Sequence, residues 1–131
     1  MKNKTYIAGI YCRTNQKDHH TLIDQKRSLR NYAKENGFEI GGYYLDDGYS
    51  GVTLDRPAFK EMITDIENGK INCVIIKDLS RLCRGFLQTA EYTDKFFPEH
   101  NVRCIGVNDG YDSLSDNETL TTVREMIQGM M

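Results

Sequence analysis

Short apolar runs alternate with amphipathic segments along this chain, and this alternation limits the folds that the chain can adopt. The apolar runs are only a few residues long and contain β-branched and aromatic side chains, which is typical of strands buried on both faces. The predicted strands are residues 6–12, 38–45, 73–77 and 102–107, and the predicted helices are residues 22–36, 57–69 and 86–98. Strands separated by helices favour a three-layer α/β fold, with a mostly parallel open sheet and helices on both faces.

The last segment of the sequence has a different pattern. Ser115 and Glu118 have the spacing of a helix capping box. Apolar residues then follow at steps of three, four and three, namely Leu120, Val123, Ile127 and Met130. Such a narrow apolar seam is typical of a helix that packs against another helix. We therefore expect a long, truncated C-terminal helix that joins copies of the chain, and the alternative is an ordinary helix packed on its own sheet.

Length and charge restrict the possible functions. A chain of 131 residues without internal repeats or a Pro/Gly-rich linker is predicted to be one domain, residues 1–131. Its net charge of −2 differs from that of a protein that binds DNA through many phosphates, so any DNA contact is expected to be local and weak. No apolar run approaches the roughly 18 residues that span a bilayer, and the basic, then apolar start is interpreted as a first strand rather than a signal peptide.

The four cysteines are Cys12, Cys73, Cys83 and Cys104. They contain no C-x-x-C pair, and three of them lie in or at the end of predicted strands. This pattern favours buried free thiols in a cytoplasmic protein over a disulfide framework or a zinc site.

Arginines follow three of the predicted strands. Ligands of open α/β sheets bind beyond the carboxyl ends of the strands, so these side chains are expected at one rim. The arginines are Arg13, Arg56, Arg81 and Arg84. A guanidinium group is always charged and can bind two phosphate oxygens at once. Arg81 and Arg84 are three residues apart and would point the same way on a helical turn. The pattern predicts an anion site that can stabilise charge in phosphoryl transfer without a metal.

Two other chemistries are compatible with residues at this rim. Carboxylates near strand ends could hold Mg²⁺, and the candidates are Asp46, Asp47, Asp78 and Asp109. Arginines are more numerous here than a metal site needs, which disfavours that alternative. Histidine catalysis is also disfavoured, because His19 and His20 are predicted in a polar loop and His100 precedes the last strand without a serine–aspartate partner pair.

Four motifs resemble those of the serine recombinases, the resolvase/invertase family, and they occur in order across essentially the whole chain. They are YCRTN at residues 11–15, TLIDQKRSL at 21–29, YSGVTLDRPAF at 49–59 and KDLSRLCR at 77–84. The first resembles the family's Tyr-x-Arg-x-Ser opening, and the last resembles its Arg-Leu-x-Arg signature. Ser80 stands where small resolvases carry an aspartate, which resembles the large and transposon-borne members.

This resemblance implies the catalytic domain of a site-specific DNA recombinase, with its DNA-binding domain outside the chain. In the family a serine attacks a phosphate of double-stranded DNA and forms a 5′-phosphoseryl link, without metal or cofactor, within dimers and tetramers. Carried over by position, Arg13, Arg56, Arg81 and Arg84 would bind the phosphate. The supporting residues would be Gln25, Asp47, Ser50 and Ser80.

Asn15 occupies the position where the resemblance places the serine nucleophile. An amide nitrogen is not a usable nucleophile, and the hydroxyl of Thr14 is expected to point the other way because side chains alternate along a strand. The leading hypothesis is a recombinase catalytic domain in a variant form. The alternative is a catalytically dead interaction module of a mobile element.

Overall fold

A five-stranded sheet in the order β2-β1-β3-β4-β5 organises residues 5–114, which are the residues that the computed structural model describes. Its strands are β1 (Ile7–Thr14), β2 (Glu39–Asp47), β3 (Cys73–Ile76), β4 (Arg103–Gly106) and β5 (Tyr111–Asp112). The first four strands pair in parallel, and β5 pairs antiparallel to β4. The predicted mostly parallel sheet is therefore confirmed, and β5 is an addition that the sequence pattern did not indicate.

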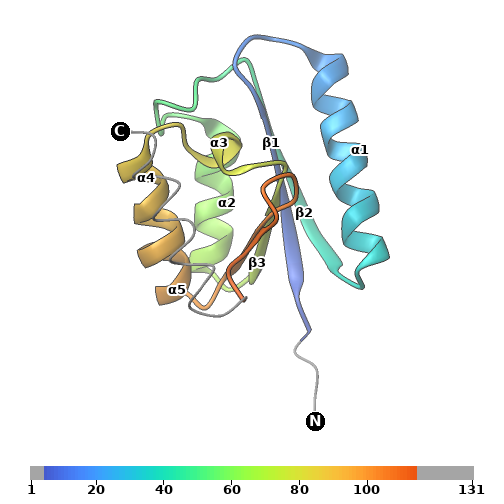
Figure 1. Ribbon diagram of the computed structural model, residues 1–131, viewed down its shortest axis with the longest axis vertical. Helices are drawn as coiled ribbons and strands as arrows, with labels where there is room; N and C mark the ends of the chain where they lie inside the picture. Colours follow the sequence, from blue (N-terminus) through green and yellow to red (C-terminus); the bar gives the residue numbers. More distant parts are fainter. Residues whose placement is uncertain (1–4, 115–131) are drawn as a thin grey trace.

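Helices cover both faces of this sheet, as predicted (Figure 1). Helix α1 (His19–Glu35) lies on one face, and α2 (Pro57–Glu67) lies on the other. Beside α2 runs a segment that changes from α4 (Phe86–Ala90) to the π-helical η1 (Glu91–Phe96) and to α5 (Phe97–Glu99). This segment corresponds to the helix predicted at residues 86–98, although its π-helical middle was not expected.

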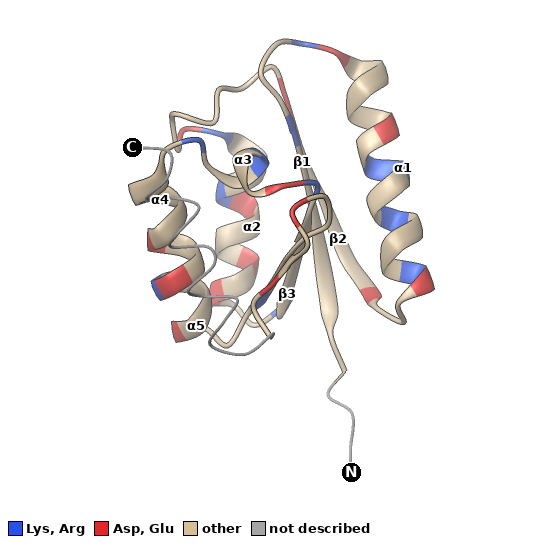
Figure 2. Ribbon diagram, viewed as in Figure 1, with Lys and Arg blue, Asp and Glu red and all other residues tan. Residues whose placement is uncertain are grey.

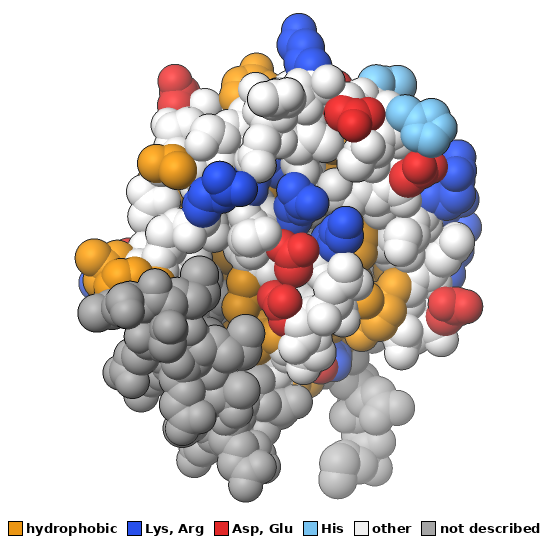
Figure 3. All heavy atoms as spheres, turned by 45° about the horizontal axis from the view of Figure 1, so that its top comes forward, with side chains coloured by type: hydrophobic (Ala, Val, Ile, Leu, Met, Phe, Trp, Pro, Cys, Tyr) orange, Lys and Arg blue, Asp and Glu red, His pale blue; other side chains and the backbone are white. Residues whose placement is uncertain are grey.

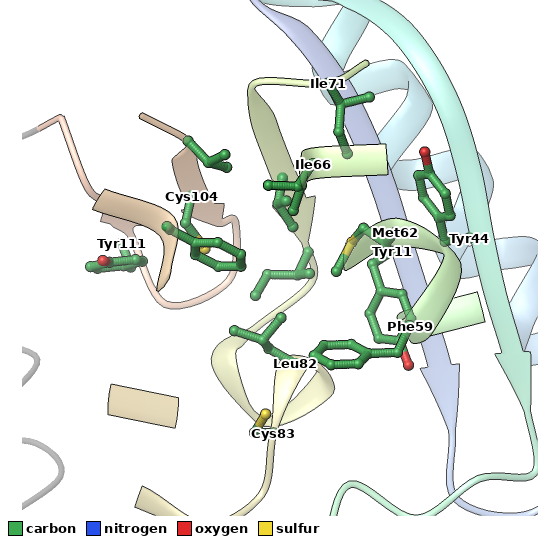
Figure 4. Packing of buried hydrophobic residues seen from close by; sticks show 14 residues of the cluster. Tyr11, Tyr44, Phe59, Met62, Ile66, Ile71, Leu82, Cys83, Cys104 and Tyr111 are labelled. Carbon is green, nitrogen blue, oxygen red and sulfur yellow. The ribbon is translucent and has the colours of Figure 1, made fainter. Parts of the chain in front are cut away.

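Side chains of the inner strands alternate between two buried cores. On one face, Ala8, Ile10 and Cys12 of β1 pack with Leu22 and Leu29 of α1. On the other face, a second core joins α2 to the sheet, and its labelled members in Figure 4 include Tyr11, Phe59, Met62, Ile66 and Leu82. Because both faces are covered, the inner strands need apolar residues at every position, and this explains their continuous apolar runs.

Three local features differ from the sequence-based expectation. Strand β1 continues to Thr14, because it pairs with β2 as far as Asp47. Helix α1 begins at His19, since the carboxylate of Asp18 accepts a hydrogen bond from the backbone N–H of Thr21 at 3.1 Å. The loop placement of His19 and His20 was therefore wrong. A short helix, α3 (Leu79–Leu82), follows β3 and was also not predicted.

All four cysteines are buried and free, as predicted. Burial raises the pKa of both Cys12 and Cys73 to about 12, so these thiols stay protonated at neutral pH. Among residues 5–114, no helix is long and apolar enough to cross a lipid bilayer. The predicted C-terminal helix, with its seam from Leu120 to Met130, lies outside the described residues.

The edge strand β5 is held by a paired arginine and aspartate. Arg103 of β4 donates from Nε to Asp112 Oδ1 at 3.0 Å and from Nη2 to Asp112 Oδ2 at 2.6 Å. Burial acts to raise the pKa of Asp112, but the hydrogen bonds and charge of Arg103 outweigh it and hold that pKa below its usual value. A strand of two residues forms few backbone hydrogen bonds to its neighbour, so the Arg103–Asp112 pair fixes the position of β5.

We expect Asp112→Asn to lower the free energy of unfolding at pH 7 by about 1–2 kcal/mol and to weaken its dependence on acid pH. A carboxyl group whose pKa is lowered by folding stabilises the protein above its unfolded pKa. That contribution is lost as the pH falls through the folded pKa, in a window below about pH 5. Urea unfolding at pH 7 and pH 3 measures both effects. Asp55→Asn is the control, because its ion pair with Lys60 is exposed to solvent. An unchanged pH dependence in Asp112→Asn would contradict this account.

Candidate functional site

The four predicted arginines meet at the carboxyl ends of β1 and β3, around α3. Figure 2 shows basic residues at this end of the sheet, and Figure 3 shows basic side chains gathered on the corresponding surface. Two of the arginines converge on one atom. Arg13 Nε donates to the carbonyl oxygen of Arg81 at 3.0 Å, and Arg56 Nη1 approaches the same oxygen at 3.4 Å. The rim predicted from the sequence is therefore present, but its arginines have two different environments.

Arg13 is buried, with 1% of its surface exposed. Besides its bond to Arg81, its guanidinium donates from Nη2 to the carbonyl of Ser80 at 2.6 Å and from Nη1 to the carbonyl of Tyr49 at 2.9 Å. A further bond from Nη1 goes to Asn15 Oδ1. Burial and the nearby charge of Arg56 lower the pKa of Arg13. Its charge is thus surrounded by carbonyl oxygens from α3 and from the loop that follows β2.

Arg56 is fully buried, with 0% of its surface exposed. It donates from Nε to the carbonyl of Thr53 at 2.8 Å and from Nη1 to the hydroxyl of Tyr11 at 3.0 Å. Its guanidinium also lies over the Phe59 ring, 4.3 Å from the ring centroid. In this conformation Arg56 has no access to an external phosphate. Its contacts instead hold the segment before α2 against β1 and α3.

Asp46 and Tyr11 complete the buried network, although the sequence indicated Asp46 only as a candidate metal ligand and Tyr11 only as part of a motif. The carboxylate of Asp46 accepts from the Tyr11 hydroxyl at 2.8 Å and from the N–H groups of Ala58 and Phe59 at 2.9 and 3.0 Å. It therefore caps α2 from a neighbouring strand. Arg56 at the N-cap position makes no such side-chain bond. A signal for this was available, because Pro57 starts α2 without a Ser, Thr, Asp or Asn before it. Burial raises the pKa of Tyr11 above its usual range, so its hydroxyl remains protonated.

Arg81 and Arg84 are the two arginines that reach towards solvent. Arg81 is half-buried in α3, and its Nε has no hydrogen-bond acceptor among the described residues. Arg84 is exposed. Arg81 and Arg84 do not share a helical turn, the condition under which they would point the same way, because α3 ends at Leu82 and Cys83 is extended (φ −150°, ψ 147°). Arg84 is instead linked to the loop between β2 and α2, since its N–H donates to the carbonyl of Gly51 at 2.9 Å.

Gln25 supports Arg13 through the backbone. Its Oε1 accepts from the N–H of Arg13 at 3.2 Å, and its Nε2 donates to the carbonyl of Arg13 at 3.3 Å. Strand β3 pairs with β1 only as far as Ile10. Gln25 of α1 therefore supplies hydrogen bonds to β1 beyond the point where β3 has diverged.

The other predicted supporting residues act locally. Asp47 accepts from Thr14 Oγ1 at 2.6 Å and from the N–H of Asp18 at 2.8 Å, and these hydrogen bonds lower the pKa of Asp47. Ser50 Oγ accepts from the N–H of Val52 at 3.1 Å. Ser80 Oγ donates to Asp78 Oδ1. None of these three side chains has a hydrogen bond to an arginine guanidinium in the described part of the chain.

Asn15 is exposed at the rim, and its Oδ1 is bonded to Arg13 Nη1. The hydroxyl of the adjacent Thr14 is bonded to Asp47 and accepts from the N–H of Gly48 at 3.0 Å. The side chain of Asn15 therefore contacts Arg13, whereas the hydroxyl of Thr14 is hydrogen-bonded to Asp47 and Gly48. The alternation expected along β1 accounts for this difference.

The carboxylates that were candidates for a metal site accept hydrogen bonds from backbone N–H groups instead. Asp46 caps α2, and Asp78 accepts from the N–H of Arg81 at the start of α3. Asp109 accepts from the N–H of Leu79 at 2.7 Å. Within residues 5–114, no group of three or more His, Cys, Asp or Glu side chains could hold a metal ion together.

Comparison with known proteins identifies the fold and the family. The crystal structure of the N-terminal catalytic domain of TP901-1 integrase is similar with a TM-score of 0.81 and 27% identity, over 94% of this chain and 92% of that chain. A resolvase family site-specific recombinase from Streptococcus pneumoniae is similar with a TM-score of 0.80 and 27% identity, over 95% and 87% of the two chains.

A relative in Bacillus subtilis (strain 168), described as a putative DNA recombinase, is 31% identical over 84 residues, which are 64% of this chain. The match covers only 17% of the length of that relative. The family model described as "Resolvase, N terminal domain" matches residues 8–130. The chain therefore belongs to the resolvase N-terminal domain family, and its fold is that of serine recombinase catalytic domains.

Proposed function

We propose that this chain is the catalytic domain of a serine-type site-specific DNA recombinase, in which Asn15 stands at the position of the nucleophile. The contact between Asn15 Oδ1 and Arg13 Nη1 carries this proposal, because it brings the side chain at that position to the arginine network. Family membership supports recombination as the reaction class. The substrate is double-stranded DNA, and arginines at the rim bind the phosphate at which the strand is cut.

The arginines divide into two groups with different tasks. Arg81 and Arg84 reach solvent and are assigned to the phosphate, where they bind its non-bridging oxygens and stabilise the charge that develops on them. Arg13 and Arg56 are buried and act through the loops that they hold. This assignment narrows the initial hypothesis that all four guanidinium groups bind the phosphate directly.

With serine at position 15, the cleavage step is a phosphoester exchange. The hydroxyl oxygen forms a bond to phosphorus, the bond from phosphorus to the 3′ oxygen breaks, and the proton lost by the serine is balanced by the one gained by the 3′ hydroxyl. The number of phosphoester bonds is conserved, so rejoining needs no external energy source. Asn15 offers no hydroxyl for this step.

The same substitution supports a second candidate, an inactive module that assembles with partner chains of a mobile element. Both candidates require self-association, which we assign to the apolar seam from Leu120 to Met130. Both also leave recognition of the DNA sequence to a DNA-binding domain outside residues 1–131. Restoring the hydroxyl at position 15 separates the two candidates.

Phosphate or sulfate is expected to raise the melting temperature of the chain by about 2–5 °C at concentrations well above the dissociation constant, because a ligand of the native state stabilises it. Arg81→Ala and Arg84→Ala should each reduce this shift. Arg27→Ala is the matched control, since Arg27 is an exposed arginine on α1 that pairs with Asp24. Thermal unfolding in phosphate and in chloride at equal ionic strength measures the effect. A shift that Arg27→Ala reduces as much as Arg84→Ala would contradict a specific site.

Arg56→Ala should destabilise the fold by about 3–5 kcal/mol, because it empties a buried position and leaves the carbonyl of Thr53 and the hydroxyl of Tyr11 without the donor that Arg56 supplies. The exposed Arg84→Ala should change stability by only about 0.5 kcal/mol. Chemical denaturation of both variants tests the division into buried and exposed arginines. Equal stability of the two variants would show that Arg56 is not a structural residue.

Asn15→Ser should restore a covalent link to DNA when the chain is joined to a DNA-binding domain of known operator. The substrate is an end-labelled duplex that carries two operator copies, and the readout is a denaturing gel with and without protease. The parent and Asn15→Ala should give no adduct. Arg81→Ala in the serine background should slow adduct formation by about 10²–10³-fold. An adduct from the parent would mean that the nucleophile lies elsewhere, and no adduct from the serine variant would favour the interaction module.

A further inference from the structure

Strand β2 lies at the end of the sheet, and within residues 5–114 no other strand pairs with its outer side. Gly41 in the middle of β2 is exposed, and because glycine has no side chain, this exposed surface is main chain. The register of β2 against β1 shifts at the same residue, which has no pairing partner in β1. Peptide groups on the open edge of a sheet can pair with an extended segment of another chain.

A row of cations on α1 borders this open edge. Lys26, Arg30 and Lys34 are four residues apart, so their side chains share one side of the helix. Lys26 shows where this side faces, because its Nζ lies 4.6 Å from the ring centroid of Tyr43 on β2. Tyr43 is itself 37% exposed, so the row lies at the surface beside β2. The three cations are termed the basic stripe, and Figure 2 shows basic residues along α1.

The basic stripe has no carboxylate partner among the described residues. Its acidic neighbours in the sequence, Glu35 and Glu39, form no ion pair with it. The Nε of Arg30 is buried and has no hydrogen-bond acceptor in this part of the chain. Like charges four residues apart destabilise a helix, and a buried donor without an acceptor costs free energy. Anions that cover the stripe would therefore stabilise α1.

The spacing of the basic stripe matches that of alternate residues in a β-strand. Four residues of an α-helix rise by about 6 Å. Two residues of a β-strand rise by about 6.6 Å, and their side chains point to the same face of the sheet. A strand that pairs with the outer side of β2 can thus place alternating carboxylates along Lys26, Arg30 and Lys34.

We propose that the outer edge of β2 and the basic stripe bind an acidic extended segment of a partner protein, which adds to the sheet as a further strand. Main-chain hydrogen bonds to β2 supply affinity, and carboxylates at alternate positions of the segment supply specificity. This site takes no part in the reaction proposed for the arginine rim, so the two proposals are independent.

The same features disfavour two other occupants. Antiparallel pairing of two β2 edges would place the basic stripes of both copies on one face of the joined sheet, where they repel each other. Duplex DNA would neutralise the stripe, but it would leave the peptide groups of the edge unpaired. The open edge and the stripe together therefore favour an acidic peptide.

The test uses the chain as it is and a short fluorescent peptide in which glutamate alternates with valine and threonine. Fluorescence anisotropy at low salt should show binding of this peptide. A peptide with glutamine in place of glutamate should bind roughly ten-fold more weakly, because three ion pairs are lost. A glutamate peptide that carries N-methyl groups along one edge should lose at least about ten-fold, because it cannot donate main-chain hydrogen bonds to β2.

Variants of the chain locate the binding site. Arg30→Gln and Lys34→Gln should each weaken binding of the glutamate peptide roughly two- to five-fold. Lys95→Gln is the matched control, since Lys95 is an exposed lysine without an ion pair on η1, which lies beside α2 on the other face of the sheet. This control should bind like the parent. Amide hydrogen exchange in β2 should slow when the peptide binds, whereas exchange in β5 should not change.

Several results would overturn this inference. Equal binding of the glutamate and glutamine peptides would refute the charge pairing, and equal binding of the N-methylated peptide would refute strand addition. No binding of the glutamate peptide, or an equal loss in Lys95→Gln, would refute the site as a whole. Slower exchange in β2 at rising concentration of the chain alone would assign the edge to a second copy. Loss of duplex DNA affinity in Arg30→Gln and Lys34→Gln, without loss of peptide affinity, would assign the stripe to DNA.

Discussion

The carbonyl oxygen of Arg81 receives hydrogen bonds from two buried guanidinium groups, and much of the site depends on this arrangement. Arg13 and Arg56 come from different segments, yet both converge on α3. A buried charge is stable only when its donors are satisfied, so each arginine dictates where the surrounding carbonyls lie. The charges of the two groups repel each other, and the carbonyl dipoles between them reduce that repulsion. Loop positions at this rim are therefore set by electrostatics as much as by apolar packing.

Tyr11 and Asp46 connect this network to α2. The Tyr11 hydroxyl accepts from Arg56 and donates to Asp46, whose carboxylate caps the helix. A displacement of α2 would thus be transmitted to Arg56 and from there to the backbone of Arg81. Apolar packing also restrains β1 and α2. The rings of Tyr11 and Phe59 pack edge-on, with their centroids 5.7 Å apart. Polar and apolar contacts therefore hold α2, β1 and α3 as one unit.

The fold was largely predictable because burial on both faces gives the strands an unmistakable apolar pattern. Elements too short to show a period were missed, namely the four-residue α3 and the two-residue β5. The location of the site also followed from the sequence, since parallel strands bring their carboxyl ends together. The burial of Arg13 and Arg56 could not be predicted from the sequence. Most of their acceptors are main-chain carbonyls, which every residue has and which no sequence motif identifies. The structural use of Asp46 left only an indirect signal, the missing N-cap side chain before Pro57, because two of its three donors are backbone N–H groups of α2.

Those main-chain acceptors have a consequence for how such a domain can diversify. The carbonyls of Tyr49, Thr53 and Ser80 remain in place whatever side chains these positions carry. Substitutions there can alter the outer surface while the two arginines keep their partners. The arginines thus constrain the path of the main chain but not the side chains along it. The outer surface of this rim can therefore change by single mutations while the buried hydrogen bonds beneath it are kept.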